Sequence, residues 1–198
     1  MSFKLFIISG IKQKKGSELN SKSDNDILKI IETDLNKGFD LVVEVYSVRL
    51  YWHIRRLVVL HEDADDALQN TFISAWRNFA NYRKESSIYT WLFAIATNEA
   101  LALIKKRARN SAVPLDDLEG LFANSVEGNS WFDGDEAMIK LQNAILALPE
   151  KQRVVFNLKY FEDMTYEDMS IVLKTSVGAL KASYHHAVKK VQNILKAV

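Results

Sequence analysis

Apolar side chains recur every three or four residues through most of this chain, and this spacing limits its fold more than any other feature. The clearest run, from residue 39 to residue 58, places apolar side chains at Phe39, Val42, Val43, Tyr46, Leu50, Ile54, Leu57 and Val58. Such spacing puts them on one face of an α-helix. The 198 residues include only seven glycines and two prolines, too few for the turns of many short strands. The sequence therefore predicts an all-α fold.

Four helices are predicted in the N-terminal half from their capping residues and apolar stripes. Asp24 is placed to cap the first helix, which is expected to end at Gly38. A long second helix follows. Asp63 is expected to cap the third helix, and Ser86 or Ser87 the fourth. Four helices of this length can bury one core.

The C-terminal segment carries the pattern of a helix-turn-helix. Pro149 suits the first turn of one helix, and Thr165, three residues before Asp168, begins a short second helix. After a turn at residues 174–175, Ser176 is expected to cap a long helix that buries Leu180, Ala187, Val188, Val191 and Leu195. The opposite face of that helix is rich in lysine and histidine, which is typical of a helix that reads the DNA major groove.

The charge of the chain is unevenly distributed along its length. The net charge is only +1, but residues 111–136 carry seven acidic and no basic side chains, while the segments on either side are each basic. We therefore expect an N-terminal arm at 1–23, a helical domain at 24–110, a flexible acidic linker at 111–136 and a helix-turn-helix domain at 137–198. A linker of this charge is expected either to move freely or to hold the two basic domains together.

Several functional classes are disfavoured by the residues themselves. The chain has no cysteine, which excludes disulfides, thiolate zinc sites and a cysteine nucleophile. It lacks the glycine-rich, zinc-protease and serine-hydrolase motifs, so we expect no enzyme activity, no cofactor and no metal. No stretch is apolar enough to cross a membrane, and a cytoplasmic location is expected. A stand-alone helix-turn-helix regulator and a helical interaction protein without a DNA role both remain possible at this point.

Two stretches of the chain resemble bacterial sigma factors of the extracytoplasmic-function (ECF) group. The first half resembles their core-binding and promoter-melting domain in Asp63-Ala-Asp-Asp-Ala-Leu-Gln-Asn-Thr-Phe-Ile-Ser-Ala-Trp76 and Tyr89-Thr-Trp-Leu-Phe-Ala-Ile-Ala-Thr-Asn98. The second half resembles their promoter-reading domain in Leu148-Pro-Glu-Lys-Gln-Arg-Val-Val-Phe156, Met164-Thr-Tyr-Glu-Asp168 and Ser176-Val-Gly-Ala-Leu-Lys181. The order and spacing of the two halves also match.

For the first half, the resemblance implies a polymerase contact and a DNA contact. The third helix would dock on a coiled coil of the largest subunit of core RNA polymerase through Asp66, Gln69, Asn70 and Phe72. The following loop and helix would capture unpaired bases of the minus-ten element and bind nearby phosphates through Tyr82, Arg83, Lys84, Ser86, Ser87, Phe93, Asn98, Lys105, Lys106, Arg107 and Arg109. Trp76 and Trp91 fit the apolar stripes and are predicted to lie in the core.

For the second half, the resemblance implies that the last helix reads duplex DNA at the minus-thirty-five element. The matching positions are Ser176, Lys181, Ser183, Tyr184, His185, His186 and Lys189. Implied partners are core RNA polymerase, including its flap region, single-stranded and duplex promoter DNA, and an anti-sigma factor, which in this family is often membrane-bound. The function implied is that of a sigma factor that directs promoter-specific transcription initiation.

Overall fold

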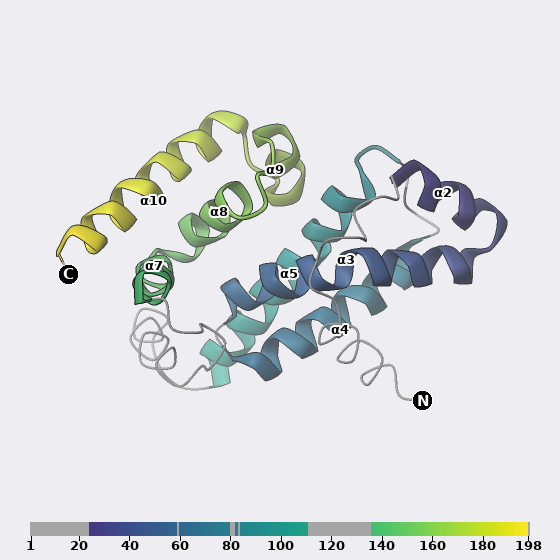
Figure 1. Cartoon of the computed structure of the whole chain (residues 1–198), viewed down its shortest axis with the longest axis horizontal. Helices are drawn as coiled ribbons and strands as arrows, with labels where there is room; N and C mark the ends of the chain where they lie inside the picture. Colours follow the sequence, from purple (N-terminus) through teal and green to yellow (C-terminus); the bar gives the residue numbers. More distant parts are fainter. Residues whose placement is uncertain (1–23, 59, 80–81, 83, 111–135, 198) are drawn as a thin grey trace.

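The computed structural model describes residues 24–58, 60–79, 82, 84–110 and 136–197. The N-terminal arm and nearly all of the expected linker lie outside these ranges. All regular structure within them is helical (Figure 1). The helices are α2 (Asp24–Thr33), α3 (Leu35–Leu57), α4 (His61–Asn78), α5 (Ile88–Asn110), α7 (Glu136–Leu146), α8 (Glu150–Tyr160), α9 (Tyr166–Leu173) and α10 (Val177–Ala197). None of these helices is long and apolar enough to cross a membrane.

The N-terminal helices α2–α5 pack around a core built from the predicted apolar stripes. The stripe of α3 is buried as expected, and Leu50, Ile54 and Leu57 are completely shielded from solvent. Helix α4 contributes Leu68 and Phe72, and α5 lies against both α3 and α4. The 3.6-residue period of the sequence therefore identified the buried face of α3 and most of that of α4.

Gly38 does not end a helix, as the sequence suggested, but lies inside α3. The break between α2 and α3 falls at Asp34, whose side chain accepts a hydrogen bond from the Lys37 backbone N–H at 3.1 Å. A Cβ atom added to Gly38 would overlap Cγ1 of Ile31 and lie 2.7 Å from its Cα. Glycine is therefore required at position 38 because α2 folds back against α3 at close range.

The predicted cap at Asp63 is wrong, and both Asp63 and Asp24 make contacts to other helices. Helix α4 begins at His61, so Asp63 lies within its first turn, is 7% exposed and pairs with Arg107 at 2.6 Å. Asp24 is the first described residue of α2 and accepts a hydrogen bond from the Ile88 N–H at 2.9 Å, so it helps to cap α5. The predicted cap at Ser87 is confirmed, because its hydroxyl accepts from the Thr90 N–H.

The C-terminal helices form the predicted helix-turn-helix. Thr165 caps α9 by accepting from the Asp168 N–H, and Ser176 caps α10 by accepting from the Ala179 N–H. Between these helices Lys174 takes the left-handed conformation, with φ of 49°. Helix α10 buries Leu180, Ala187 and Val191 as expected, but the predicted core residue Leu195 is 38% exposed, because it lies in the last helical turn.

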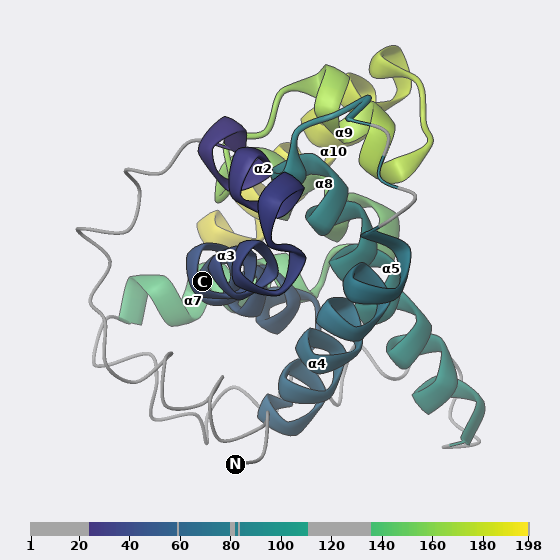
Figure 2. The ribbon, with the colours of Figure 1, turned by 90° about the vertical axis from the view of Figure 1, so that its right-hand side faces the viewer.

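The two groups of helices are docked against each other. Helix α9 contacts α5, and α8 contacts α3 (Figures 1 and 2). One continuous cluster of buried apolar side chains includes Val154, Leu158 and Met169 from the C-terminal half together with Leu50 and Phe93 from the N-terminal half. A smaller second cluster, centred on Phe156, lies between α7, α8 and α10. Burial of this shared apolar surface favours the docked arrangement.

His53 of α3 lies at the centre of this arrangement and is completely buried. Its Nε2 atom lies 2.9 Å from the Thr97 hydroxyl of α5, and its ring packs on Phe93. Burial, assisted by the positive charge of Arg56, lowers the pKa of the imidazole to about 3. His53 is therefore neutral in the folded protein at physiological pH.

Gly38→Ala is expected to lower the free energy of unfolding by about 1–3 kcal/mol, because the added methyl group meets the Ile31 backbone. Gly178→Ala provides the matched control. Position 178 lies in α10 with nothing within 4 Å of an added Cβ, so alanine there is expected to be neutral or to stabilise by up to about 1 kcal/mol. Urea denaturation of both variants measures the difference, and equal effects would contradict the assigned close approach.

Acidification is expected to destabilise the fold through His53. The pKa of His53 is about 3 in the folded protein and about 6.5 in the unfolded chain, so between these values only the unfolded chain takes up the proton. This histidine should remove about 1 kcal/mol of stability between pH 6.5 and pH 5.5. His53→Gln should flatten that part of the pH profile of unfolding. A variant profile as steep as that of the wild type would show that other groups cause the loss.

Candidate nucleic-acid interface

Tyr82 lies in the connection between α4 and α5, with its ring held against the end of both helices. The ring centroid is 5.8 Å from that of Phe79 and 5.1 Å from that of Trp91, and the hydroxyl donates to the Ser86 carbonyl at 2.5 Å. Burial raises the pKa of the phenol, and the Asp24 carboxylate raises it further. The Tyr82 ring is therefore held in place by Phe79, Trp91 and the Ser86 carbonyl, and it is only partly buried. Such a ring suits stacking on a single unpaired nucleobase.

The other described residues of this connection present cationic and hydroxyl groups. Lys84 has a positive φ of 59° and forms an ion pair with Glu32 of α2 at 2.6 Å, with both side chains more than half exposed. Ser86 is half-buried, and the exposed Ser87 uses its hydroxyl to cap α5. Arg83, which the resemblance also assigned to this site, lies outside the described residues.

The connection is anchored where it enters α5. One carboxylate oxygen of Asp24 accepts from the Ile88 N–H, and the other accepts a short hydrogen bond from the Tyr46 hydroxyl of α3. Burial raises the pKa of Tyr46, and the Asp24 carboxylate adds to this increase, so the hydroxyl keeps its proton. Asp24 thus joins α2, α3 and the start of α5 beside the loop.

Along α5, the residues assigned to DNA separate into exposed and buried ones. Asn98, Lys105, Lys106 and Arg109 are exposed, whereas the half-buried Arg107 is engaged with Asp63 of α4. Phe93 departs from expectation because it is completely buried, with its ring 4.4 Å from that of Tyr89. It cannot touch a base while the two halves are docked.

Helix α4 presents a stripe of solvent-facing residues at helical spacing. Asp66 and Asn70 are exposed and Gln69 is half-buried, whereas Phe72 is 1% exposed and belongs to the core rather than to the predicted contact surface. Trp76, predicted to be a core residue, is 43% exposed and extends this stripe, while Trp91 is half-buried. Residues 66, 69, 70, 73 and 76 are spaced three or four apart and therefore share one face of the helix. This spacing could have placed Trp76 on the exposed face with Asp66.

The exposed face of α10 carries most of the residues predicted to read duplex DNA. Lys181, His185, His186 and Lys189 are exposed. Ser183 is half-buried, as is Tyr184, whose ring lies 5.9 Å from that of Phe156 and whose pKa is raised by burial. Ser176 is exposed at the start of the helix. Within the described ranges, no three His, Asp or Glu side chains are grouped as metal ligands would be.

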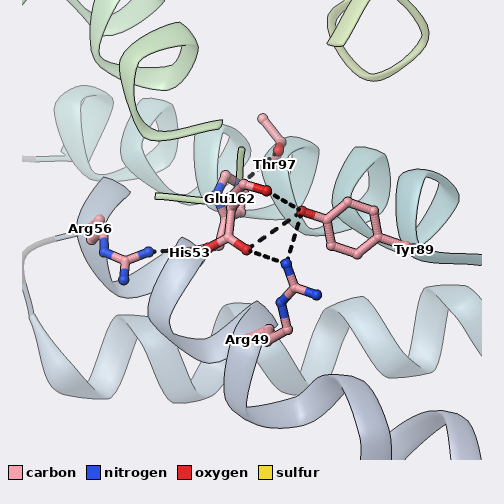
Figure 3. A network of polar contacts seen from close by, with 6 residues as sticks. All are labelled: Arg49, His53, Arg56, Tyr89, Thr97 and Glu162. Atoms are coloured by element: carbon pink, nitrogen blue, oxygen red, sulfur yellow. Dashed lines mark hydrogen bonds and ion pairs between the residues drawn. The ribbon is translucent and has the colours of Figure 1, made fainter. Parts of the chain in front are cut away.

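A polar network at the contact between the two halves was not anticipated from the sequence. Glu162, just after α8, is ion-paired with Arg49 and Arg56 of α3 at 3.2 Å each (Figure 3). The Tyr89 hydroxyl of α5 donates to the Glu162 side chain at 3.5 Å and to its backbone carbonyl at 3.4 Å. Nearby, Thr90 donates to Asp168 of α9 at 3.0 Å. Residues this distant in sequence leave no local pattern, so no sequence signal predicted their pairing.

Two known protein families match this chain, one in each half. Sigma-70 region 2 matches residues 42–110, and Sigma-70, region 4 matches residues 138–191. Together the two matches cover more than half of the chain. The first spans α4 and α5 with most of α3, and the second spans the helix-turn-helix.

Individual relatives are similar over nearly their whole length. The RNA polymerase sigma-H factor of Pseudomonas aeruginosa is 27% identical over an alignment of 194 residues that covers 90% of this chain and 96% of that protein. The ECF RNA polymerase sigma factor SigW of Bacillus subtilis is 25% identical over 177 residues, covering 85% and 95%.

Two solved structures share the fold. The sigma factor RpoE in complex with the anti-sigma factor NepR from Bartonella quintana has a TM-score of 0.63 at 22% identity, over 83% of this chain and 98% of that one. CnrH in complex with the cytosolic domain of CnrY has a TM-score of 0.66 at 20% identity, over 89% and 99%. The chain therefore belongs to the sigma-70 family as a sigma factor of the ECF group, which acts in promoter-specific transcription initiation by RNA polymerase.

Proposed function

We propose that this chain recognises its promoters in two places, with α5 and the preceding loop at the minus-ten element and with α10 at the minus-thirty-five element. The observation that carries this proposal is the presence of both sigma-70 regions in one chain, each on a half that presents exposed cationic side chains. A stand-alone helix-turn-helix regulator would need no region 2, and none of the similar proteins favours that alternative.

At the minus-ten element the proposed task is to hold bases that have left the double helix. Unstacking a base costs a few kcal/mol, which stacking on an aromatic ring and contacts to phosphate offset. Tyr82 supplies the ring, and Lys84 supplies a cation at the same loop. The exposed Lys105, Lys106 and Arg109 at the far end of α5 are suited to the phosphates of adjoining duplex.

At the minus-thirty-five element the exposed face of α10 is proposed to enter the major groove. Lys181 lies in the second turn of α10, the part of a recognition helix that meets base edges, and its ammonium can donate to guanine acceptors. His185 and His186 provide donors or acceptors further along the helix. Ser176, at the N-terminus of α10, is placed to contact a phosphate.

Core RNA polymerase is proposed to dock on the exposed stripe of α4 with Trp76 as its apolar anchor. A half-exposed tryptophan beside polar residues is typical of the energetic centre of an interface. Asp66, Gln69 and Asn70 would form the polar part of that contact, which we assign to the coiled coil of the largest subunit. The helix-turn-helix half is proposed to meet the flap region.

Regulation and location follow the same family pattern. One solved neighbour is bound to the anti-sigma factor NepR and the other to the cytosolic domain of CnrY, and we propose that an anti-sigma factor also binds this chain. The chain would act in the cytoplasm, where the polymerase is. It would carry out no reaction of its own, because bond formation belongs to the polymerase.

Run-off transcription with purified core polymerase tests the whole proposal. Genomic promoter fragments should give discrete transcripts only when the chain is added, and scrambling either promoter element should abolish them. If the chain neither bound core polymerase nor gave a promoter-specific transcript, the proposal would be wrong.

Tyr82→Ala should reduce strand opening by roughly tenfold, because one base loses its stacking partner. Permanganate reactivity of unpaired thymines measures opening, and a mobility shift at low temperature measures closed-complex binding, which should change little. Tyr82→Phe keeps the ring and loses only the hydrogen bond to the Ser86 carbonyl, so it should open promoters nearly as the wild type does. Equal losses of opening and of closed-complex binding would contradict the capture role.

Trp76→Ala should weaken binding to core polymerase by about tenfold or more, the usual effect of removing an aromatic anchor. Leu60→Ala is the matched control, since Leu60 is 39% exposed and lies at the opposite end of the same helix. Fluorescence titration of labelled chain with core polymerase gives both dissociation constants. Similar values for the two variants would remove Trp76 from the docking surface.

A further inference from the structure

The contact between the two halves centres on one carboxylate that neutralises two arginines. The Glu162 side chain is only 6% exposed, whereas those of Arg49 and Arg56 are 45% and 22% exposed. Arg49 also lies over the Tyr89 ring at 4.7 Å, and Arg56 over the Phe161 ring at 4.0 Å. The acidic partner is thus the more deeply enclosed one, surrounded by donors from α3 and α5 (Figure 3).

The three groups that surround the Glu162 carboxylate form a donor cluster that belongs entirely to the N-terminal half. Arg49, Arg56 and the Tyr89 hydroxyl all lie on α3 and α5, and only their acceptor comes from the other half. If the C-terminal half moves away, these groups keep their positions on the helices but lose the carboxylate. Two positive charges and a hydroxyl would then face the gap without an anion.

The chemistry of this donor cluster suits a phosphate oxygen as well as it suits a carboxylate. A guanidinium presents planar donors that match both anions, and arginine is preferred wherever either is bound. The donor cluster also adjoins the start of α5, where the partial positive charge of a helix N-terminus adds to the field. There Thr90 holds a second carboxylate of the C-terminal half, Asp168. Two acidic side chains therefore cover donors that adjoin the loop proposed to capture DNA.

We propose that Arg49, Arg56 and Tyr89 form a binding site for a backbone phosphate of promoter DNA, and that Glu162 occupies this site while the two halves are docked. This proposal rests on the proposed promoter recognition, because it assigns a further DNA contact to the same half. Docking then blocks DNA at this site in two ways, because Glu162 occupies the phosphate position and the C-terminal half covers α5. Separation must also expose the shared apolar cluster, so it requires the compensating surface of a partner such as core polymerase.

The first arm of the test removes the internal occupant. Glu162→Gln keeps the size of the side chain but removes the charge that holds both arginines. In the free protein this variant should favour separation of the halves, seen as a larger radius of gyration in small-angle scattering and a severalfold faster association with core polymerase. In the holoenzyme, where the proposal requires the halves to be apart, its promoter affinity and salt dependence should equal those of the wild type.

The second arm removes a donor of the site itself and should affect promoter binding by the holoenzyme. Arg49→Gln also loosens the docked state, but in the holoenzyme it should weaken promoter binding severalfold and reduce the slope of log affinity against log salt by about 1. Lys37→Gln is the charge-matched control, because Lys37 is 79% exposed on the same helix and pairs only with Asp34 among the described contacts. Thermal melting confirms that each variant is folded, and Arg56→Gln provides a second test of the site.

The outcomes separate this proposal from the one on which it rests. An Arg49→Gln holoenzyme with the wild-type affinity and salt slope would make the arginines a docking contact alone and would overturn the phosphate site. Weaker binding of core polymerase with an unchanged salt slope would assign them to the polymerase and would also overturn it. A Glu162→Gln protein that keeps the wild-type size and association rate would refute the role of Glu162. Failure of promoter recognition itself would appear in the wild type, as the absence of promoter-specific transcripts.

Discussion

The packing of α8 and α9 against α3 and α5 determines which surfaces of this molecule are available. Apolar side chains of both halves merge into one buried cluster, and the polar groups trapped beside it are paired across the contact. A buried carboxylate without partners would be costly, so Glu162 stabilises docking only together with its two arginines. This arrangement leaves the stripe of α4 and the cationic face of α10 open, while α9 packs against α5.

Local patterns were sufficient to predict most of the secondary structure. Apolar spacing located the helices and the buried face of α3, and hydroxyl side chains at Ser87, Thr165 and Ser176 cap the helices that they were predicted to cap. These predictions succeeded because a cap or an amphipathic face involves residues within a few positions of each other. The helix-turn-helix was predictable for the same reason.

The errors came from interactions between residues that are distant in sequence. Gly38 was predicted to end a helix, but it lies within α3, where the close approach of Ile31 of α2 leaves no room for a Cβ atom. Phe72 was assigned to a contact surface and Trp76 to the core, but the structure buries Phe72 and leaves Trp76 exposed. Contacts of α4 with α3 and α5, which are distant in sequence, decide which side of the helix is buried. The two arginine partners of Glu162 lie more than a hundred positions earlier in α3, where no short motif could indicate them.

The hydrogen bond from Ile88 to Asp24 changes where the N-terminal half should be considered to begin. The match to Sigma-70 region 2 starts at residue 42, which leaves α2 outside it. Yet the first turn of α5 is completed by a carboxylate on α2, and Lys84 of the adjoining loop is held by Glu32 of the same helix. The smallest piece that retains this loop geometry therefore begins at α2. In this sense α2 is part of the proposed DNA-binding surface, although it carries none of the residues proposed to touch DNA.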